Sequence, residues 1–316
     1  MRLGITMGDP RGIGPEIILR SLKESPLLQQ SEVWLYGDSQ IFSHLPSAGA
    51  NGRSAILVPV TQGPSGLSWT DEECGHASIL YLEQAVRDAM EKKIDALVTA
   101  PICKAHLKKA GYDYPGHTEF LAEKTGSQKF VMMMASPSLK VSLVTIHVPL
   151  KDVPHRISED KIIDTVRITF DSLKEFWGLA HPRVAVCGLN PHAGEEGVIG
   201  KEEITLIGPA LNQLREQGYE LEGPWVPDAV FHQAYEGKFD AVVCMYHDQG
   251  LIPFKMLHFR DGVNVTLGLP IIRTSPDHGV AFDIVGKGLA DPSSMLAAIE
   301  LAYQMAEIKK RRGGPS

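Results

Sequence analysis

The sequence predicts an α/β protein built around a mainly parallel sheet, and three observations support this. The chain has 316 residues, of which 43% are hydrophobic and 22% charged, a composition typical of a globular protein. Short runs of β-branched and aliphatic residues recur along it and indicate strands. Longer amphipathic segments separate these runs, as in parallel strands joined by helical crossovers. The length suffices for one large or two ordinary domains.

Several of the expected strands are apolar at every position, as strands with helices on both faces must be. In chain order they are Leu3–Met7, Glu32–Tyr36, Ala55–Val58, Ala96–Thr99, Phe130–Met134, Val141–Ile146, Val184–Gly188, Ala241–Met245 and Val263–Leu267. The clearest helical patterns between and after them are Ala77–Lys92, Glu159–Trp177, Glu202–Gln217 and Ser293–Lys310. The last ends in four consecutive cations, which suit the negative end of a helix dipole.

Charge, hydropathy and cysteine content exclude several classes of protein. With 31 basic and 38 acidic side chains the net charge is −7, which argues against a nucleic-acid partner. No apolar run approaches the roughly 18 residues needed to span a bilayer, so no membrane partner is expected. The four cysteines lie far apart without a C-x-x-C spacing and indicate reduced thiols. We therefore expect a cytoplasmic protein.

A glycine-rich segment, GDPRGIGPE at residues 8–16, follows the first strand. It is not a dinucleotide fingerprint, because Ile17 stands where the third glycine should be, and it lacks the ending of a Walker loop. Its glycines could let backbone N–H groups approach an anion. The alternative is a tight turn with Pro15 opening a helix.

Three of the twelve histidines follow apolar strands at their carboxyl ends. They are His147, His192 and His247. Ligand sites in open α/β sheets lie outside these ends, and three neutral imidazoles with one open position make a catalytic metal site. Each histidine taken alone could instead be a structural residue bonded to a backbone carbonyl.

A second set of polar residues is suited to an anion. His117 and Thr118 follow a Tyr-Pro turn, and Lys255, Asn264 and Arg273 recur nine residues apart. Lys and Arg bind phosphate or carboxylate, and an amide within an apolar strand needs partners. The alternative is that these cations are solvated surface charges.

These residues lie in strings that resemble one family throughout the chain, in the same order. The strings are GDPRGIGPE, TAPICK, GHTEF, GLNPHAGE, MYHDQG, GVNVTLGLP, IRTSPDHG and GKGLADPSS. They resemble the 4-hydroxythreonine-4-phosphate dehydrogenase (PdxA) family of pyridoxal 5′-phosphate biosynthesis. Arg11 departs from the family pattern, which more often has a small residue there.

The resemblance implies a two-domain α/β fold of the isocitrate/isopropylmalate-dehydrogenase type, with a cleft between the domains and no Rossmann fold. It suggests a discontinuous first domain of residues 1–116 and 270–316. Residues 117–269 would form the second domain, carrying the metal and dimer-interface residues.

The resemblance also assigns roles to residues. It places a divalent metal on His147, His192 and His247, and substrate contacts on His117, Thr118, Lys255, Asn264 and Arg273. Lys104, Asp228 and Asp248 also match family positions and are the candidate catalytic residues, Lys104 and Asp248 for proton transfer. The active site would be shared across a homodimer, with two metal histidines from one subunit and His247 of the partner subunit.

The implied activity is metal-dependent oxidation of 4-phosphooxy-L-threonine by NAD or NADP, followed by decarboxylation to 3-amino-2-oxopropyl phosphate. Zinc is the expected metal, with Mg²⁺, Co²⁺ or Mn²⁺ as alternatives. Similar paralogues oxidise D-threonate or D-erythronate 4-phosphate, or a terephthalate-type cis-dihydrodiol dicarboxylate. A phosphate acyltransferase of related fold and a non-catalytic metal-binding protein are remoter alternatives.

Overall fold

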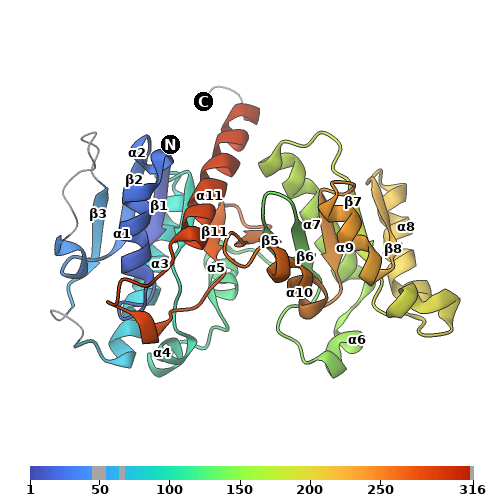
Figure 1. The fold of residues 1–316 in the computed structure, drawn as a ribbon, viewed down its shortest axis with the longest axis horizontal. Helices are drawn as coiled ribbons and strands as arrows, with labels where there is room; N and C mark the ends of the chain where they lie inside the picture. The colour runs from blue at the N-terminus through green and yellow to red at the C-terminus, as the bar shows by residue number, and fades with distance from the viewer. Residues whose placement is uncertain (45–54, 64–67, 314–316) are drawn as a thin grey trace. The chain divides into compact units, whose positions relative to one another are not determined.

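The computed structural model describes residues 1–44, 55–63 and 68–313 (Figure 1). The chain forms two compact units. Unit 1 consists of Met1–Gln128 and Leu269–Lys310, and unit 2 is formed mainly by Lys129–Gly268. The domain boundaries expected from the sequence stay a prediction; the main difference from the two units is that residues 117–128 belong to unit 1 and not to the second part of the chain. Among the described helices, none is long and apolar enough to span a membrane.

Unit 1 contains a parallel sheet with the strand order β3-β2-β1-β4-β11. Its strands are β1 (Arg2–Thr6), β2 (Glu32–Asp38), β3 (Ile56–Thr61), β4 (Ala96–Thr99) and β11 (Arg273–Pro276). Every residue of β4 and all but the first of β1 are buried, as expected for strands between two helical layers. Parallel order also places the carboxyl ends of all five strands at one edge.

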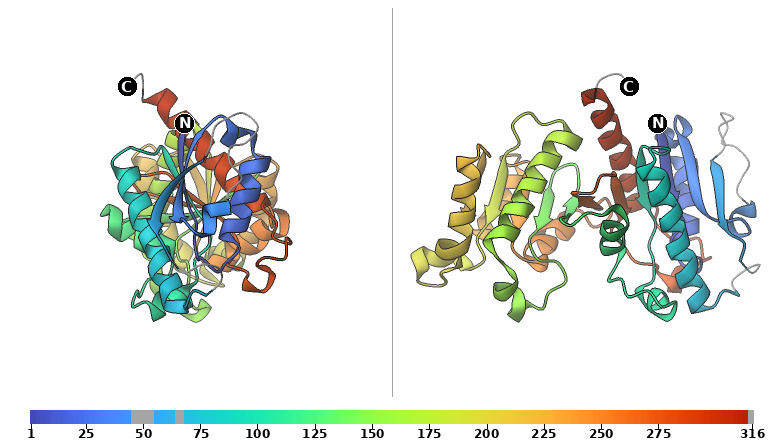
Figure 2. Two further views of the ribbon diagram at one scale, coloured as in Figure 1. Left: turned by 90° about the vertical axis from the view of Figure 1, so that its left-hand side faces the viewer. Right: turned by 180° about the vertical axis from the view of Figure 1, so that it is seen from behind.

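Helices cover both faces of this sheet. They are α1 (Gly14–Glu24), α2 (Pro26–Gln29), α3 (Asp71–Met90), α4 (Lys104–Lys109), α5 (His117–Thr125) and α11 (Ser293–Arg312), with 3₁₀ turns η1 (Ile41–His44) and η5 (Phe282–Ile284). Helix α3 contacts β1, β2, β3 and β4, and α1 and α11 lie on the opposite face (Figure 2, left). Helix α3 begins with a capping box, in which the Thr70 side chain and Glu73 satisfy each other's backbone N–H groups.

Unit 2 contains a mixed sheet with the strand order β10-β5-β6-β9-β7-β8. Its strands are β5 (Val131–Ala135), β6 (Lys140–Leu143), β7 (Val184–Cys187), β8 (Leu221–Trp225), β9 (Ala241–Cys244) and β10 (Val263–Leu267). Strands β6, β9, β7 and β8 are parallel, whereas β5 is antiparallel to both of its neighbours. Only residues 136–139 join β5 to β6, and a parallel pair needs a much longer crossover.

The helices of unit 2 also lie on both faces of the sheet. They are α6 (Val153–Arg156), α7 (Glu159–Trp177), α8 (Gly208–Glu216), α9 (Pro227–Tyr235) and α10 (His247–Leu257), with short turns η2 (Leu150–Asp152), η3 (Pro191–Gly197) and η4 (Glu203–Ile207). Helix α7 contacts β5, β6, β7 and β9, while α9 and α10 pack on β9 from the other face (Figures 1 and 2).

The main differences from the predicted elements have local causes. Strand β8 was not expected, because Gly223 and Pro224 interrupt its apolar pattern. Strand β11 was not expected either, because its sequence RTSP is polar and yet fully buried. The helix expected over 202–217 begins as the π-helical turn η4 and becomes α-helical only from Gly208. Strand β6 ends at Leu143, three residues earlier than predicted.

Candidate active site

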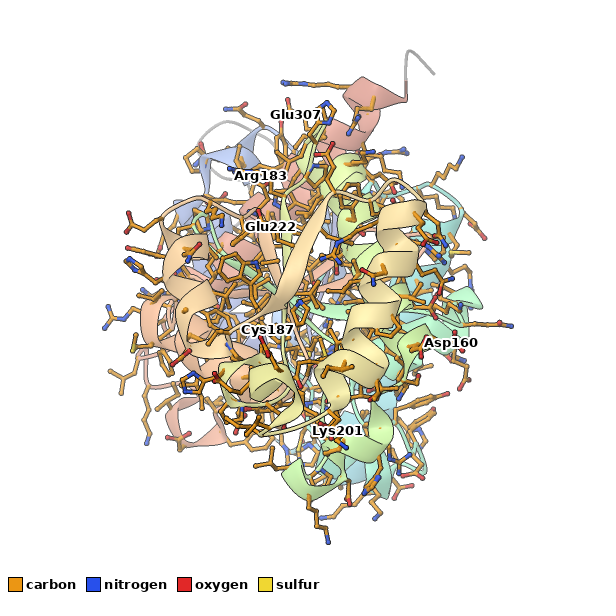
Figure 3. The ribbon with its side chains drawn as sticks, turned by 90° about the vertical axis from the view of Figure 1, so that its right-hand side faces the viewer. Asp160, Arg183, Cys187, Lys201, Glu222 and Glu307 are labelled. Atoms are coloured by element: carbon orange, nitrogen blue, oxygen red, sulfur yellow. The ribbon has the colours of Figure 1, made fainter. Side chains whose placement is uncertain are left out.

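Three neighbouring parallel strands of unit 2 carry the predicted metal histidines. The strands β6, β9 and β7 lie side by side, so the segments that follow them leave the same edge of the sheet. His147 follows β6, His247 follows β9, and His192 follows β7. Figure 3 shows the direction of β7, from Arg183 before the strand to Cys187 at its end, with Lys201 of the following segment beyond Cys187. The predicted position of each histidine after a strand end is confirmed.

His147 and His247 lie close together within one chain, with their ring centroids 5.8 Å apart. His247 is the first residue of α10, and its Nδ1 lies 2.6 Å from Oδ1 of Asp248. A histidine that donates from Nδ1 to a carboxylate keeps the lone pair of Nε2 for a cation. Asp248, predicted as a catalytic residue, is therefore placed to orient His247.

His192 lies in a segment with an unusual backbone conformation. His192, Ala193, Glu195 and Glu196 all have positive φ angles between 45° and 52°, and Gly194 has φ 82°. Left-handed conformations are unfavourable for residues other than glycine, so the surroundings must hold this segment in place. The His192 side chain is 65% exposed, and its Nδ1 lies 3.7 Å from Glu195.

The three histidines of one chain do not form a closed ligand set. Within the described residues, only Asp9, Cys103 and His106 bring three potential ligand atoms within 4.8 Å of one another. Hydrogen bonds account for this cluster: His106 Nδ1 lies 2.6 Å from Asp9, and its Nε2 lies 2.9 Å from Arg11 Nη2. Both ring nitrogens are thus engaged and a cation stands beside one of them, so the cluster does not suit a metal ion.

The glycine-rich segment of unit 1 forms a tight turn at the start of α1. Helix α1 begins at Gly14 with Pro15 in its first turn, which is the second of the two interpretations of this segment. Gly8 has φ 75°, and a Cβ on it would lie 2.3 Å from the carbonyl oxygen of Pro101. Arg11 pairs with Asp71 and contacts His106, so this departure from the family pattern joins the turn to α3 and α4.

Arg273 is a buried cation of unit 1. The residue is only 2% exposed, and its Nε and Nη2 donate to Oγ1 of Thr99 at 3.1 and 2.7 Å. Burial lowers the pKa of Arg273 to about 9, and the charge of Glu119 opposes this shift. The guanidinium therefore stays protonated at neutral pH. The alternative, that this cation is a solvated surface charge, does not apply to Arg273.

His117 is the first residue of α5, and the charge of Arg273 acts on its side chain. Its Nε2 is buried and has no hydrogen-bond partner. Burial, and then the charges of Arg273 and Lys104, lower the pKa of His117 well below its usual value, so the imidazole is neutral. Thr118 follows in the first turn of α5, where backbone N–H groups favour an anion. Lys104, the first residue of α4, lies near Gly116.

The other predicted residues belong to unit 2. Asn264 stands in β10 opposite Met134 of β5, and its buried Oδ1 has no hydrogen-bond partner. Lys255 lies in the last turn of α10, and Asp228 in the first turn of α9, a helix that contacts η3 and hence the His192 segment. The roles of these three residues stay predictions. Sequence reasoning missed Thr99, whose contact with Arg273 joins two strands far apart in the chain.

Comparison with known proteins identifies the family. A family model described as "Pyridoxal phosphate biosynthetic protein PdxA" matches residues 35–302. The chain is 47% identical to a 4-hydroxythreonine-4-phosphate dehydrogenase of Desulfosudis oleivorans, over 98% of this chain and 97% of that protein. It is also 41% identical to a protein of Oceanobacillus iheyensis named "Putative D-threonate 4-phosphate dehydrogenase", over 97% of this chain and 98% of that one.

Solved structures agree with these sequence relatives. A 4-hydroxythreonine-4-phosphate dehydrogenase from Klebsiella pneumoniae is 39% identical, with a TM-score of 0.87 over 96% of this chain and 98% of that chain. A terephthalate 1,2-cis-dihydrodiol dehydrogenase from Burkholderia xenovorans is 28% identical, with a TM-score of 0.70 over 96% and 98% of the two chains. The predicted α/β fold is confirmed, and the close relatives are dehydrogenases. The chain therefore belongs to the PdxA family of 4-hydroxythreonine-4-phosphate dehydrogenases.

Proposed function

We propose that this enzyme oxidises the secondary alcohol of 4-phosphooxy-L-threonine with NAD⁺ or NADP⁺. A hydride passes to the nicotinamide and a proton to a base of the protein, and the resulting β-keto acid loses CO₂ to leave 3-amino-2-oxopropyl phosphate. The observation that carries the proposal is the anion site of unit 1. A protonated, buried Arg273 and the partnerless buried Nε2 of His117 are suited to a phosphate or carboxylate group.

The donor set of unit 2 suits a divalent cation. His147 and His247 lie close together, and the Nδ1 contact of His247 with Asp248 leaves Nε2 for a metal. We propose that His147, His192 and His247 hold Zn²⁺, with Mg²⁺, Co²⁺ or Mn²⁺ as alternatives. Such a cation lowers the pKa of the substrate alcohol and polarises the ketone that forms from it.

The chain's own residues would bind and orient the substrate and move its proton. Arg273, His117 and Thr118 would hold an anionic end, and Lys255 and Asn264 are proposed for further substrate contacts. The buried Asn264 Oδ1 without a partner supports a ligand at that position. Fixed anchors of this kind set the geometry of hydride transfer.

Proton transfer is proposed for residues at the starts of helices. Lys104 at the start of α4 and Asp248 at the start of α10 are the candidates, and Asp228 in α9 is a third catalytic candidate. The charge of Lys104 acts on His117, which supports a place for its ammonium beside the anion site. The contact between Asp248 and His247 supports a role at the metal histidines.

We also propose that the enzyme is a homodimer that shares its active site. Large apolar side chains are exposed on α10 and just beyond it, with Ile252 66%, Met256 79% and Phe259 76% exposed. Apolar surface of this kind is typical of an interface. Because α10 begins with His247, covering this helix would bring a second copy close to that histidine. All four cysteines are free, which supports the proposed cytoplasmic location.

A second candidate substrate is a four-carbon sugar-acid 4-phosphate, because the Oceanobacillus iheyensis relative carries that name. The dihydrodiol alternative has support from the Burkholderia xenovorans structure, at lower identity. Membership of a dehydrogenase family removes the support for a phosphate acyltransferase and for a non-catalytic protein.

Formation of reduced nicotinamide tests the proposal. The metal-depleted enzyme is assayed with NAD⁺ and NADP⁺, before and after addition of Zn²⁺ or Mg²⁺. The substrates are 4-phosphooxy-L-threonine, D-threonate 4-phosphate, D-erythronate 4-phosphate and the dihydrodiol dicarboxylate. We expect metal-dependent turnover that is fastest with 4-phosphooxy-L-threonine. Faster turnover of a sugar-acid phosphate would assign the second substrate, and turnover of the unphosphorylated dihydrodiol alone would overturn both.

A further inference from the structure

A continuous chain of hydrogen bonds ties together the ends of β6, β9 and β7. It passes through the backbone just before each predicted metal histidine, and two buried polar side chains, Gln249 and Glu203, complete it. We propose that Gln249 and Glu203 are positioning residues that hold the three histidines in register for the metal. This inference rests on the proposed metal-binding role of the histidines.

The first link joins the His147 segment to the His247 segment. The backbone N–H of Thr145 and its Oγ1 both donate to the carbonyl oxygen of Met245, at 3.2 and 2.7 Å. Thr145 stands two residues before His147, and Met245 two residues before His247. Both Thr145 and Met245 are buried. Because one carbonyl oxygen accepts both hydrogen bonds, neither segment can move far without the other.

Gln249 forms the second link, from the His247 segment to the His192 segment. The residue is buried, with 8% of its surface exposed. The amide Oε1 accepts from the N–H of Met245 at 2.7 Å, and Nε2 donates to the carbonyl oxygen of Gly188 at 2.8 Å. These two hydrogen bonds require an acceptor and a donor at the end of one side chain. At this length, the primary amide of glutamine supplies both at neutral pH.

Glu203 forms the third link, within the His192 segment. Its Oε1 accepts from the N–H groups of Leu189 and Asn190, both at 2.7 Å, and its Oε2 accepts from the Asn190 side chain at 3.0 Å. The residue is 4% exposed, so these bonds compensate a buried carboxylate. A Cβ on Gly194 would lie 2.6 Å from Oε2, so the segment is folded tightly onto this carboxylate.

The left-handed run from His192 to Glu196 explains why such bracing is needed. Its positive φ angles are unfavourable and persist only where surrounding contacts hold the backbone in that conformation. His192 itself is largely exposed, so contacts of its own side chain cannot hold it. The backbone before it, bonded to Glu203 and Gln249, supplies the constraint. Residues that orient metal ligands in this way typically change metal affinity 10- to 100-fold when altered, in order of magnitude.

The test measures metal binding by Gln249→Met and Glu203→Gln. Gln249→Met keeps the length and loses both bonds, and Glu203→Gln keeps the shape and loses the charge. Exposed residues of α8 provide matched controls, Gln213→Met and Glu216→Gln. Zn²⁺ affinity is measured by competition with a chelator, and the visible spectrum of bound Co²⁺ reports the ligand geometry.

We expect each inner variant to bind Zn²⁺ about 10- to 100-fold more weakly and to change the Co²⁺ spectrum, while the controls match the wild type. Gln249→Glu is measured as well, in case Gln249→Met fails to fold. Its carboxylate can still accept from the N–H of Met245 but cannot donate to Gly188. It should keep part of the affinity. Unchanged affinity and spectrum in folded inner variants would overturn the inference alone. If His247→Ala also binds metal as the wild type does, the proposed metal site fails, and the inference with it.

Discussion

Replacing Arg273 by methionine should make the ligand-free enzyme more stable and abolish most of its activity. The pKa of Arg273 falls well below the usual value of a guanidinium, to about 9, because the side chain is buried. One pKa unit corresponds to about 1.36 kcal/mol, so burying the charged guanidinium destabilises the folded state by on the order of 5 kcal/mol. The bonds from Nε and Nη2 share one acceptor, Oγ1 of Thr99, so each is counted at the lower end of its range, about 1.5 kcal/mol, and together they offset about 3 kcal/mol of that cost. A net cost of about 2 kcal/mol remains.

Arg273→Met removes this cost and fills the space with an apolar side chain of similar length. We expect its free energy of unfolding, measured with urea in the absence of ligand, to exceed that of the wild type by about 2 kcal/mol. A phosphorylated substrate loses a charge-assisted bond of about 3 kcal/mol, so kcat/KM should fall about 100-fold or more. The exposed Arg87→Met on α3 is the control and should change stability by less than about 0.5 kcal/mol.

The reasoning is refuted if ligand-free Arg273→Met is less stable than the wild type by about 2 kcal/mol or more. Arg273 would then be a structural residue whose contacts outweigh its burial. A stable variant with unchanged kcat/KM would equally remove Arg273 from the anion site.

Two further predictions follow from unit 1. His117 is neutral when folded but protonates near its usual pKa of 6.5 when unfolded, so the unfolded state binds the extra proton and stability is lost as pH falls below 6.5. Between pH 7 and pH 5, the free energy of unfolding of His117→Gln, measured with urea, should therefore fall by less than that of the wild type. An equal fall in both proteins would contradict this. Gly8→Ala combines a left-handed φ with a clash against the Pro101 carbonyl, whereas Gly111→Ala has a similar φ and open space around it. Gly8→Ala should lower the free energy of unfolding by more than about 2 kcal/mol, and Gly111→Ala by about 1 kcal/mol. Equal decreases for the two variants, measured by thermal unfolding, would show that the clash is absent.

Sequence patterns located the elements whose periodicity is undisturbed. The ranges predicted for β4, α7 and β10 coincide with the observed ones, because each is a clean apolar or amphipathic run. Strand β11 escaped detection because its residues are polar. They are buried only because Arg273 and Thr274 find partners in Thr99 and the backbone of α11. Such compensation depends on contacts with distant parts of the chain.

The candidate site also has a part that the sequence predicted and a part that it did not. The residue types and their placement after strand ends were evident from the sequence, as was the family from its motifs. Whether three strand ends are neighbours depends on the order β6-β9-β7, which does not follow the chain. Gln249 and Glu203 gave no signal of their own, because a glutamine or glutamate in a polar segment is ordinarily a solvated residue.

By itself the sequence determined the α/β class, the family and the residues with chemistry to offer, since these depend on local periodicity, composition and ordered motifs. Tertiary structure alone decided which of these residues meet. The Gln249–Gly188 bond spans 61 residues, the Asp9–His106 bond 97 and the Arg273–Thr99 bond 174. A buried polar group is stable only when its partner arrives with matching geometry, and chain folding, not sequence proximity, brings that partner.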